Sequence, residues 1–260
     1  DVIIIGGGPG GTKAAKVLGR AGKKVALIAD DLGGECLNYG CIPTKTYLWT
    51  ADFLEKAAGS EIYGLEGAAS AKVNWEKMKD RKNKVVSKLK QGLTFSVQSA
   101  KVEIITGRGS FVNDHTVKVG EQTYEASHII IATGSQAIMP PGFTLGEKII
   151  SNKEILDLPS IPKNLLIIGA GAVGVEFASV FQALGTDVTL AEGADRLLPN
   201  EDKEVSSELE KIFNRKKITI WKNKHVTAED LAPFEKVLVA IGRKPSIDSL
   251  NLEASGVSVE

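Results

Sequence analysis

The chain has 260 residues, and its 32 Lys and Arg side chains are balanced by 32 Asp and Glu side chains. This balance argues against a dedicated nucleic-acid binder, which carries a basic excess. No uninterrupted apolar run approaches the ~20 residues that a membrane helix needs, and we expect neither a membrane nor a nucleic-acid partner. Two cysteines are too few for a secreted disulfide scaffold.

Strands and helices alternate along the chain, which predicts an α/β fold with parallel sheets. Short β-branched runs predict strands buried on both faces at Val2–Ile5, Val25–Ala29, Val102–Ile105, His128–Ala132, Leu165–Ile168, Val188–Ala191, Ile218–Trp221 and Val237–Ile241. Apolar residues at helical spacing predict helices at Thr12–Arg20 and Val175–Leu184.

The middle of the first half differs in pattern. Residues 44–97 predict two longer helices joined by a loop near Gly64 and Gly67, and the second helix carries a lysine-rich face that includes Lys82. We interpret that face as solvated rather than as a polyanion site. Residues 102–124 alternate in polarity and turn at Asn113-Asp114, which predicts a small antiparallel sheet.

One glycine pattern occurs twice. Gly6-x-Gly8-x-x-Gly11 and Gly169-x-Gly171-x-x-Gly174 each follow a predicted strand and open a predicted helix. This context is typical of a dinucleotide-binding turn, in which the helix N-terminus faces a pyrophosphate. A single match could be an ordinary glycine turn, but two matches in the same context predict two bound dinucleotides.

An acidic residue about 20 positions further on binds a ribose hydroxyl in such folds. Glu192 stands near that distance in the second copy, at the end of a strand, and favours NAD over NADP because a carboxylate repels a 2′-phosphate. In the first copy the matching position is Ala29, and Asp30 follows it. We predict that Asp30 takes the role with a small shift.

Cys36 and Cys41 lie in the segment Leu32-Gly33-Gly34-Glu35-Cys36-Leu37-Asn38-Tyr39-Gly40-Cys41-Ile42-Pro43-Thr44-Lys45. A structural disulfide closing so short a loop would contribute only about 2 kcal/mol from chain entropy. Pro43 suits the start of a helix, which would place Cys41 near a helix N-terminus with Lys45 close by and favour the thiolate. We therefore predict a redox role, the alternative being structural or free thiols.

Cys-Leu-Asn-x-Gly-Cys-Ile-Pro-Thr-Lys and both glycine motifs resemble the class I pyridine nucleotide-disulfide oxidoreductases, most closely the dihydrolipoamide dehydrogenase branch. The resemblance covers essentially the whole chain. It implies two tandem Rossmann-like domains, one for FAD and one for NAD. It also implies a dithiol substrate such as dihydrolipoamide or a lipoyl domain, and a cytoplasmic homodimer.

The resemblance also assigns residues. Cys36 would exchange with the dithiol, Cys41 would sit against the flavin as its charge-transfer thiolate, and Lys45 would lie near the flavin and pair with Glu176. No metal site is implied. The other positions that it implies for cofactor binding are Gly6, Gly8, Pro9, Gly10, Gly11, Asp30, Gly33, Gly34, Gly109, Thr133, Gly134, Ser135, Gly169, Gly171, Val173, Gly174, Glu192, Val226 and Gly242.

The chain departs from this family in several places. Glu35 replaces the usual Thr, Tyr39 the usual Val, and Thr44 the usual Ser. Residues 222–235 are too short for the usual hairpin, so we expect residues to be missing there. The C-terminal dimerisation domain and its catalytic His–Glu pair are absent, and we expect the chain to be part of a longer protein.

The predicted domains are residues 1–145 for FAD and the redox disulfide, residues 146–246 for NAD, and residues 247–260 for a return segment. The predicted activity is an FAD-dependent, dihydrolipoyl dehydrogenase-like transfer of electrons between a dithiol and NAD+. Two alternatives stay open. One is a mercuric or glutathione-like reductase of the same family, and the other is a non-catalytic subunit that binds FAD and NAD.

Overall fold

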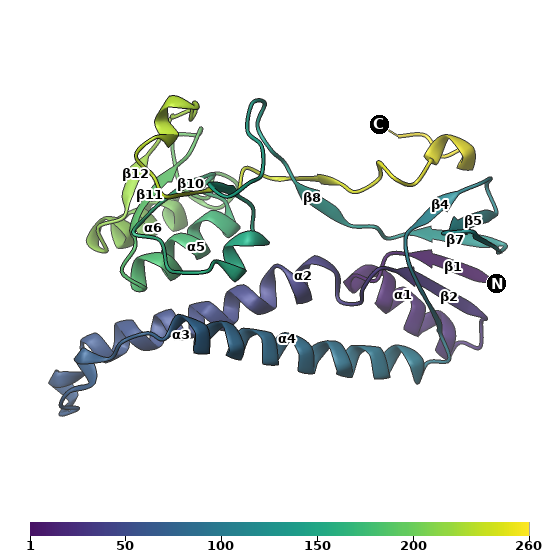
Figure 1. The fold of residues 1–260 in the computed structure, drawn as a ribbon, viewed down its shortest axis with the longest axis horizontal. Coiled ribbons are helices and arrows are strands. Elements are labelled where there is room, and N and C mark those ends of the chain that lie inside the picture. The colour runs from purple at the N-terminus through teal and green to yellow at the C-terminus, as the bar shows by residue number, and fades with distance from the viewer. Residues whose placement is uncertain (260) are drawn as a thin grey trace. The chain divides into compact units, whose positions relative to one another are not determined.

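A computed structural model describes residues 1–259 and divides the chain into two compact units (Figure 1). Unit 1 comprises residues 1–42, 84–136 and 244–260, and unit 2 comprises residues 43–83 and 137–243. Among the described residues, no helix has both the length and the apolar composition required to cross a membrane.

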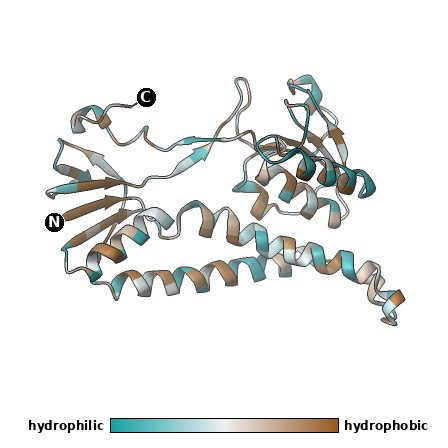
Figure 2. Ribbon diagram, turned by 180° about the vertical axis from the view of Figure 1, so that it is seen from behind, coloured by the Kyte–Doolittle hydropathy of each residue, from teal (hydrophilic) through white to brown (hydrophobic). Residues whose placement is uncertain are grey.

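Unit 1 is built on a four-stranded parallel sheet in the order β3-β2-β1-β7. Its strands are β1 (Val2–Ile5), β2 (Val25–Ala29), β3 (Glu103–Thr106) and β7 (His128–Ile131). The strand at the marked N-terminus is hydrophobic along its length (Figure 2), and all four of its residues are buried. Helix α1 (Pro9–Arg20) connects β1 to β2. This order is the first half of a doubly wound fold.

A smaller antiparallel sheet completes unit 1 and confirms the predicted excursion. It consists of β4 (Gly109–Phe111), β5 (Thr116–Val119) and β6 (Gln122–Glu125). Phe111 and Val117 from this sheet pack with Ile3 and Ile5 of β1. The short helix η5 (Leu252–Ser255) contributes Leu252 to the same cluster.

Unit 2 is built on a five-stranded parallel sheet in the order β12-β11-β10-β13-β9. Its central strand β10 is buried at four of five positions, which explains its uninterrupted apolar sequence. The bounds are β9 (Ile149–Ile150), β10 (Asn164–Ile168), β11 (Asp187–Ala191), β12 (Thr219–Trp221), β13 (Lys236–Val239), α5 (Ala172–Ala183) and α6 (Lys203–Arg215). The predicted strands are confirmed to within two residues at each end, but β3, β7 and β12 have no buried residue, so the prediction of burial on both faces is wrong for these sheet-edge strands.

The two long helices predicted between residues 44 and 97 are present. They are α3 (Cys41–Ala58) and α4 (Trp75–Gln98), with the short helices η1 (Ser60–Tyr63) and η2 (Ala68–Ser70) between them. Residues 43–83 pack with unit 2, whereas the prediction placed them in the FAD-binding domain. The prediction of which residues bind which dinucleotide stays a prediction.

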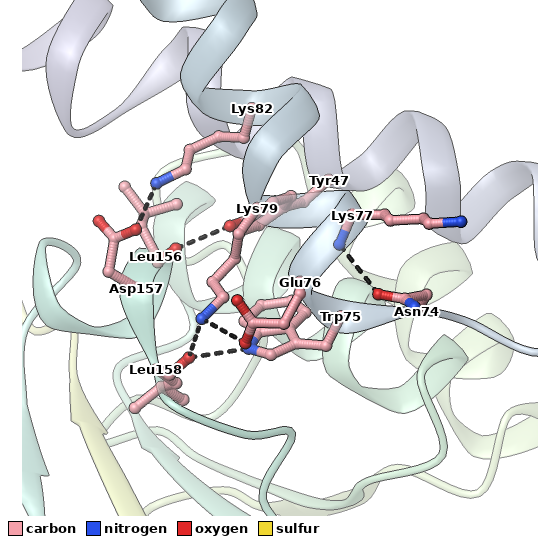
Figure 3. A network of polar contacts seen from close by, with 10 residues as sticks. All are labelled: Tyr47, Asn74, Trp75, Glu76, Lys77, Lys79, Lys82, Leu156, Asp157 and Leu158. Carbon is pink, nitrogen blue, oxygen red and sulfur yellow. Dashed lines mark hydrogen bonds and ion pairs between the residues drawn. The ribbon is translucent and has the colours of Figure 1, made fainter.

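Four side chains from α3 and α4 contact residues 156–158 (Figure 3). This segment consists of the end of the short helix η3 (Glu154–Asp157) and the residue after it. The Tyr47 hydroxyl donates to the Leu156 carbonyl at 2.7 Å, and the Trp75 indole donates to the Leu158 carbonyl at 2.8 Å. Burial and the nearby Asp157 carboxylate raise the pKa of Tyr47, so its hydroxyl remains a donor. Both bonds lie within unit 2, where they join residues 43–83 to the segment 156–158.

Lys82 corrects the prediction of a fully solvated lysine face. Its side chain is only 4% exposed, and its ammonium forms a 2.6 Å ion pair with Asp157 (Figure 3). The ion pair compensates the cost of burying the charge, which leaves Lys82 as a structural contact. Lys79 lies near the same segment and donates to the Leu158 carbonyl at 3.2 Å.

Residues 222–235 connect β12 to β13, and the expectation that residues are missing there relative to the family stays a prediction. The short helix η4 (Glu229–Leu231) lies in this connection, and Asp230 accepts hydrogen bonds from the backbone and hydroxyl of Thr227. Leu231 and Phe234 pack onto the sheet. The remaining strands, β8 (Ser135–Ala137) and β14 (Arg243–Pro245), pair with each other where the chain passes between the units.

Candidate functional site

The first glycine loop, Gly6–Gly11, forms what we call the first cradle, and its outer glycines are required by the protein backbone. Gly6 has φ +119°, and a Cβ there would lie 2.1 Å from the Ala132 carbonyl oxygen. A Cβ at Gly11 would lie 1.9 Å from the carbonyl oxygen of Gly6. Any side chain at either position would therefore displace backbone from β1, β7 or α1.

The second loop, Gly169–Gly174, is the second cradle and repeats this arrangement in unit 2. Gly169 has φ +102°, and a Cβ there would lie 2.4 Å from the Ala240 carbonyl oxygen. A Cβ at Gly174 would lie 1.9 Å from the carbonyl oxygen of Gly169. Each loop thus lies between the central strand and the neighbour at which the strand order reverses, the place where doubly wound sheets bind ligands.

The middle glycine of each cradle is not required by the protein itself. A Cβ at Gly171 would meet no atom within 4 Å, and one at Gly8 would meet only the Gly34 Cα, at 3.7 Å. Gly8 and Gly171 are the N-cap residues of α1 and α5. Neither helix has a side chain that bonds its first N–H groups or an acidic residue in its first turn. The open backbone and the unpaired helix N–H groups fit a diphosphate, which supplies the reason for glycine at these positions.

The residues predicted beside each cradle lie at the same sheet edges. Thr133 and Gly134 directly follow β7, and Gly134 has φ +72°. Gly242 follows β13 with φ +139°, and its carbonyl accepts the Ile138 N–H at 3.0 Å. Pro9 and Gly10 open α1 and are exposed. These positions surround the two switch points.

Three further predicted cofactor residues differ in their surroundings. Val173 lies in the first turn of α5 and is exposed. Val226 packs against the apolar cluster on one face of the second sheet. Gly109 begins β4, where an added Cβ would approach Val117 and Ile5 to 3.0 and 3.2 Å. For Gly109 the packing of unit 1 is thus already a reason for glycine.

Glu192 is the acid of the second cradle, and its carboxylate is already bonded to the loop. One oxygen accepts the Ala170 N–H at 2.6 Å, and the other accepts the Ala194 N–H at 2.9 Å. Each carboxylate oxygen can accept a further hydrogen bond. Glu192 therefore combines a structural contact to the cradle with a negative charge at the end of β11.

Two consecutive acids follow β2 at the first cradle, and each forms an ion pair. Asp30 accepts a hydrogen bond from the Arg108 Nε at 2.6 Å, and Asp31 pairs with Lys90 of α4. The Asp30 hydrogen bond and charge raise the pKa of Arg108. Sequence reasoning missed Arg108 and Lys90. The only signal for Arg108 was its place between two glycines just past a predicted strand.

The cysteine segment contacts the first cradle directly. The Gly33 N–H donates to the Gly7 carbonyl at 2.8 Å. Gly34 has φ +56°, and a Cβ there would lie 2.6 Å from the Gly8 Cα. The short helix α2 (Gly34–Asn38), which carries Cys36, therefore begins against the middle glycine of the first cradle.

The chain between the cysteines turns back on itself. The Tyr39 N–H donates to the Glu35 carbonyl at 2.8 Å. A Cβ at Gly40 would lie 3.5 Å from the Cys36 Cα, so the residue before Cys41 packs against the backbone of Cys36. Cys36 is half-buried, whereas Cys41 is exposed and is the first residue of α3. Cys36 thus lies in the middle of the short helix α2, and Cys41 lies at the start of the long helix α3.

Asn38, between the two cysteines, has a buried side-chain oxygen that no group in the described chain satisfies. Its amide nitrogen donates to the Leu32 carbonyl at 3.0 Å, but its Oδ1 has no partner. A buried acceptor without a donor is costly. A hydroxyl or N–H of a bound flavin fits this requirement.

Lys45 and Glu176 come together in unit 2. The Lys45 Nζ lies 2.5 Å from the Glu176 Oε1, and their side chains are 57% and 27% exposed. Lys45 stands one helical turn after Cys41 on α3, and Glu176 lies on α5 two residues after Gly174. Among residues 1–259, no three His, Cys, Asp or Glu side chains gather closely enough to hold a metal ion.

Comparison with known proteins gives a consistent result. The family described as pyridine nucleotide-disulphide oxidoreductase matches residues 1–260. A dihydrolipoyl dehydrogenase of Bacillus subtilis is 39% identical over 280 residues, covering 98% of this chain and 61% of its own. One from Chlamydia pneumoniae is 36% identical over 274 residues, covering 99% and 59%.

A solved structure also resembles the chain. The HOCl-induced flavoprotein disulfide reductase RclA from Escherichia coli superposes with a TM-score of 0.85 at 30% identity, over 100% of this chain and 60% of that one. The chain thus spans about three fifths of the length of these relatives.

Proposed function

The chain belongs to the pyridine nucleotide-disulphide oxidoreductase family, and we propose that it is the nucleotide-binding and thiol-bearing part of an FAD-dependent disulfide oxidoreductase. The observation that carries this proposal is the contact between the cysteine segment and the first cradle. Because Gly34 packs on Gly8, a flavin dinucleotide bound at the first cradle would lie next to the helix that carries Cys36.

The groups that would hold the flavin fit it in three respects. The middle glycine of the first cradle leaves room for a diphosphate, the N-terminus of α1 offers unpaired N–H groups, and Asn38 Oδ1 needs a donor. When bound, the flavin supplies two-electron transfer between the thiol pair and a nicotinamide. The second cradle, which has the same geometry, is the proposed nicotinamide site.

The chain's own residues perform the thiol exchange. A thiolate of the dithiol substrate attacks Cys36 of the oxidised pair, and the Cys41 thiolate leaves. The second substrate thiol then displaces Cys36, so the substrate leaves as a disulfide and the pair as a dithiol. The Lys45 ammonium, neutralised by Glu176, stays one turn from Cys41 on α3. With NAD+ as final acceptor, each dithiol oxidised yields one NADH and one proton.

We propose NAD rather than NADP as the partner of the second cradle. The Glu192 carboxylate lies at the end of β11 and is fixed by two backbone N–H groups. A fixed negative charge there accepts a ribose hydroxyl and repels a 2′-phosphate. This choice, together with the names of the relatives, favours dihydrolipoamide as the dithiol over a glutathione-like or metal-ion substrate. A cytoplasmic homodimer completes the proposal.

Anaerobic reduction of the flavin-loaded protein tests the proposed function. Two electrons per flavin should produce long-wavelength absorption from a thiolate lying against the flavin, and replacing Cys41 with Ser should remove it. A protein that binds flavin but never shows this absorption would be a binding subunit, the other function class that the sequence leaves open. A protein that takes up no flavin would contradict both.

A further inference from the structure

An exposed ion pair lies at the carboxyl end of β2 and β3, beside the first cradle. Ala29 and Thr106 are in register at the ends of these strands. Asp30 and Arg108 follow them by one and two residues, and the Arg108 Nε donates to the Asp30 Oδ2 at 2.6 Å. The backbone carbonyl oxygen of the next residue, Asp31, lies close to Gly7. A Cβ added at Gly7 would be 2.5 Å from this oxygen. The backbone that follows β2 and carries Asp30 therefore lies against the first cradle.

The backbone that carries Arg108 is fixed on both sides. Gly107 has φ +141°, and a Cβ there would lie 2.6 Å from Val119 Cγ1. Gly109 packs against Val117 and Ile5. The Gly107 N–H also donates to the Ala29 carbonyl at 3.2 Å. Arg108 thus projects from a close-packed turn rather than from a loose loop.

The Arg108 side chain keeps most of its hydrogen-bonding capacity for another molecule. A guanidinium has five N–H donors. Within the described chain Arg108 uses only its Nε–H, and its side chain is 78% exposed, so the other donors can reach a ligand. Asp30 likewise uses one carboxylate oxygen. An exposed pair contributes little stability by itself, so stability is a weak reason for this arrangement.

We propose that Asp30 and Arg108 together form the subsite for the adenosine ribose of the first dinucleotide. The position that normally provides the acid is Ala29, which has no polar side chain. Asp30 accepts a ribose hydroxyl in its place. Arg108 is the positioning residue, since it fixes the orientation of the displaced carboxylate and offers further N–H donors to the same ribose. This inference rests on the proposed function, which places FAD in the first cradle.

The adjacent ion pair provides a matched control. Lys90 pairs with Asp31 one residue further along the chain. The Asp31 carboxylate also accepts the N–H of its neighbour Leu32 at 2.8 Å, so it is engaged within its own turn. Replacing Lys90 removes an exposed ion pair of the same kind, but from an acid that the proposal does not assign to the ribose.

Binding of FAD and of an FAD analogue with 2′-deoxyadenosine to flavin-depleted protein tests the assignment. Quenching of flavin fluorescence gives the dissociation constants for the wild type, Asp30→Ala, Arg108→Ala, Arg108→Lys and Lys90→Ala. We expect the wild type to prefer FAD, and Asp30→Ala and Arg108→Ala to bind FAD roughly tenfold more weakly without that preference. Arg108→Lys should retain part of the preference for FAD over the 2′-deoxy analogue, and Lys90→Ala should retain all of this preference.

Several outcomes would overturn the inference. A wild type that binds both flavins equally, or an Arg108→Ala protein that keeps the wild-type preference, would show that the pair does not contact the ribose. Equal losses in Lys90→Ala would show a general effect of charge. If the folded wild type, checked by circular dichroism, binds neither flavin, the proposed function fails first, and the inference fails with it.

Discussion

The variant Gly171→Ala distinguishes two reasons for glycine in the second cradle, which are the packing of the protein itself and the approach of the backbone to a diphosphate. The Gly171 backbone has φ −73° and ψ −176°, which any residue adopts, and a Cβ there meets no protein atom within 4 Å. The free energy of unfolding should therefore change by less than about 1 kcal/mol, the cost of alanine at a helix cap. The methyl group instead occupies the space through which the backbone approaches a diphosphate. We expect NADH affinity to fall at least about tenfold, or ~1.4 kcal/mol.

Gly174→Ala is the matched control three residues away. Its Cβ would lie 1.9 Å from the Gly169 carbonyl oxygen, closer than any real contact allows. The helix and strand must separate, so we expect a loss of about 3 kcal/mol or more in the free energy of unfolding. Thermal unfolding by circular dichroism and NADH fluorescence titration on both variants measure the two effects separately.

Three outcomes would contradict the prediction for these two glycines. A Gly171→Ala protein that binds NADH like the wild type would show that the second cradle does not hold the diphosphate. A Gly174→Ala protein as stable as the wild type would show that the steric requirement is wrong. An equal loss of stability in both variants would mean that Gly171 is structural as well.

Three further predictions follow from single contacts. Glu192→Gln should weaken NADH binding about tenfold and narrow the difference between NADH and NADPH, because the charge is lost while an acceptor remains; an unchanged ratio of the two dissociation constants would refute the assignment of NAD. Cys36→Ser should keep the long-wavelength absorption on anaerobic reduction and Cys41→Ser should abolish it, whereas the opposite pattern would exchange their roles. Tyr47→Phe leaves the Leu156 carbonyl without its donor, so urea denaturation should give a free energy of unfolding lower by about 1–3 kcal/mol; an unshifted midpoint would mean that water replaces the hydroxyl.

The two sheets could be predicted from the sequence because burial on both faces leaves a clear pattern. The runs 2–5 and 165–168 are uninterrupted and apolar, and each is followed by a glycine whose close contact with the neighbouring strand's end permits no side chain. Local sequence therefore carried most of the fold of each unit.

The packing of residues 43–83 could not be predicted, because it depends on partners distant in sequence. The polar atoms of Tyr47 and Trp75 bond to backbone carbonyls that lie 109 and 83 residues away in the sequence, respectively. Lys82 shows the same difficulty, since nothing near it in the sequence predicts Asp157. Helical periodicity gives the face of a helix but not which unit covers it.

The same limit applied to the site. Glycine loops, the cysteine spacing and Glu192 are local signals, and each could be found by inspection of the sequence. The Asp30–Arg108 pair joins the ends of two strands that are neighbours only in the folded sheet. The absence of an acid at position 29 and the presence of Asp30 beside it were visible in the sequence, but the pairing of Asp30 with Arg108 was not.

The acids beside the two cradles, Asp30 and Glu192, are held by different contacts, and we expect this difference to affect binding. Glu192 is bonded to the N–H of Ala170, inside its own glycine loop. Removing that carboxylate therefore changes the loop as well as the ribose contact, and affinity for the diphosphate should fall with it. Within residues 1–259 the Asp30 carboxylate is bonded to Arg108 alone, so its removal should leave the first loop intact. ADP-ribose binding in the second cradle should then be more sensitive to loss of its acid than FAD binding is in the first.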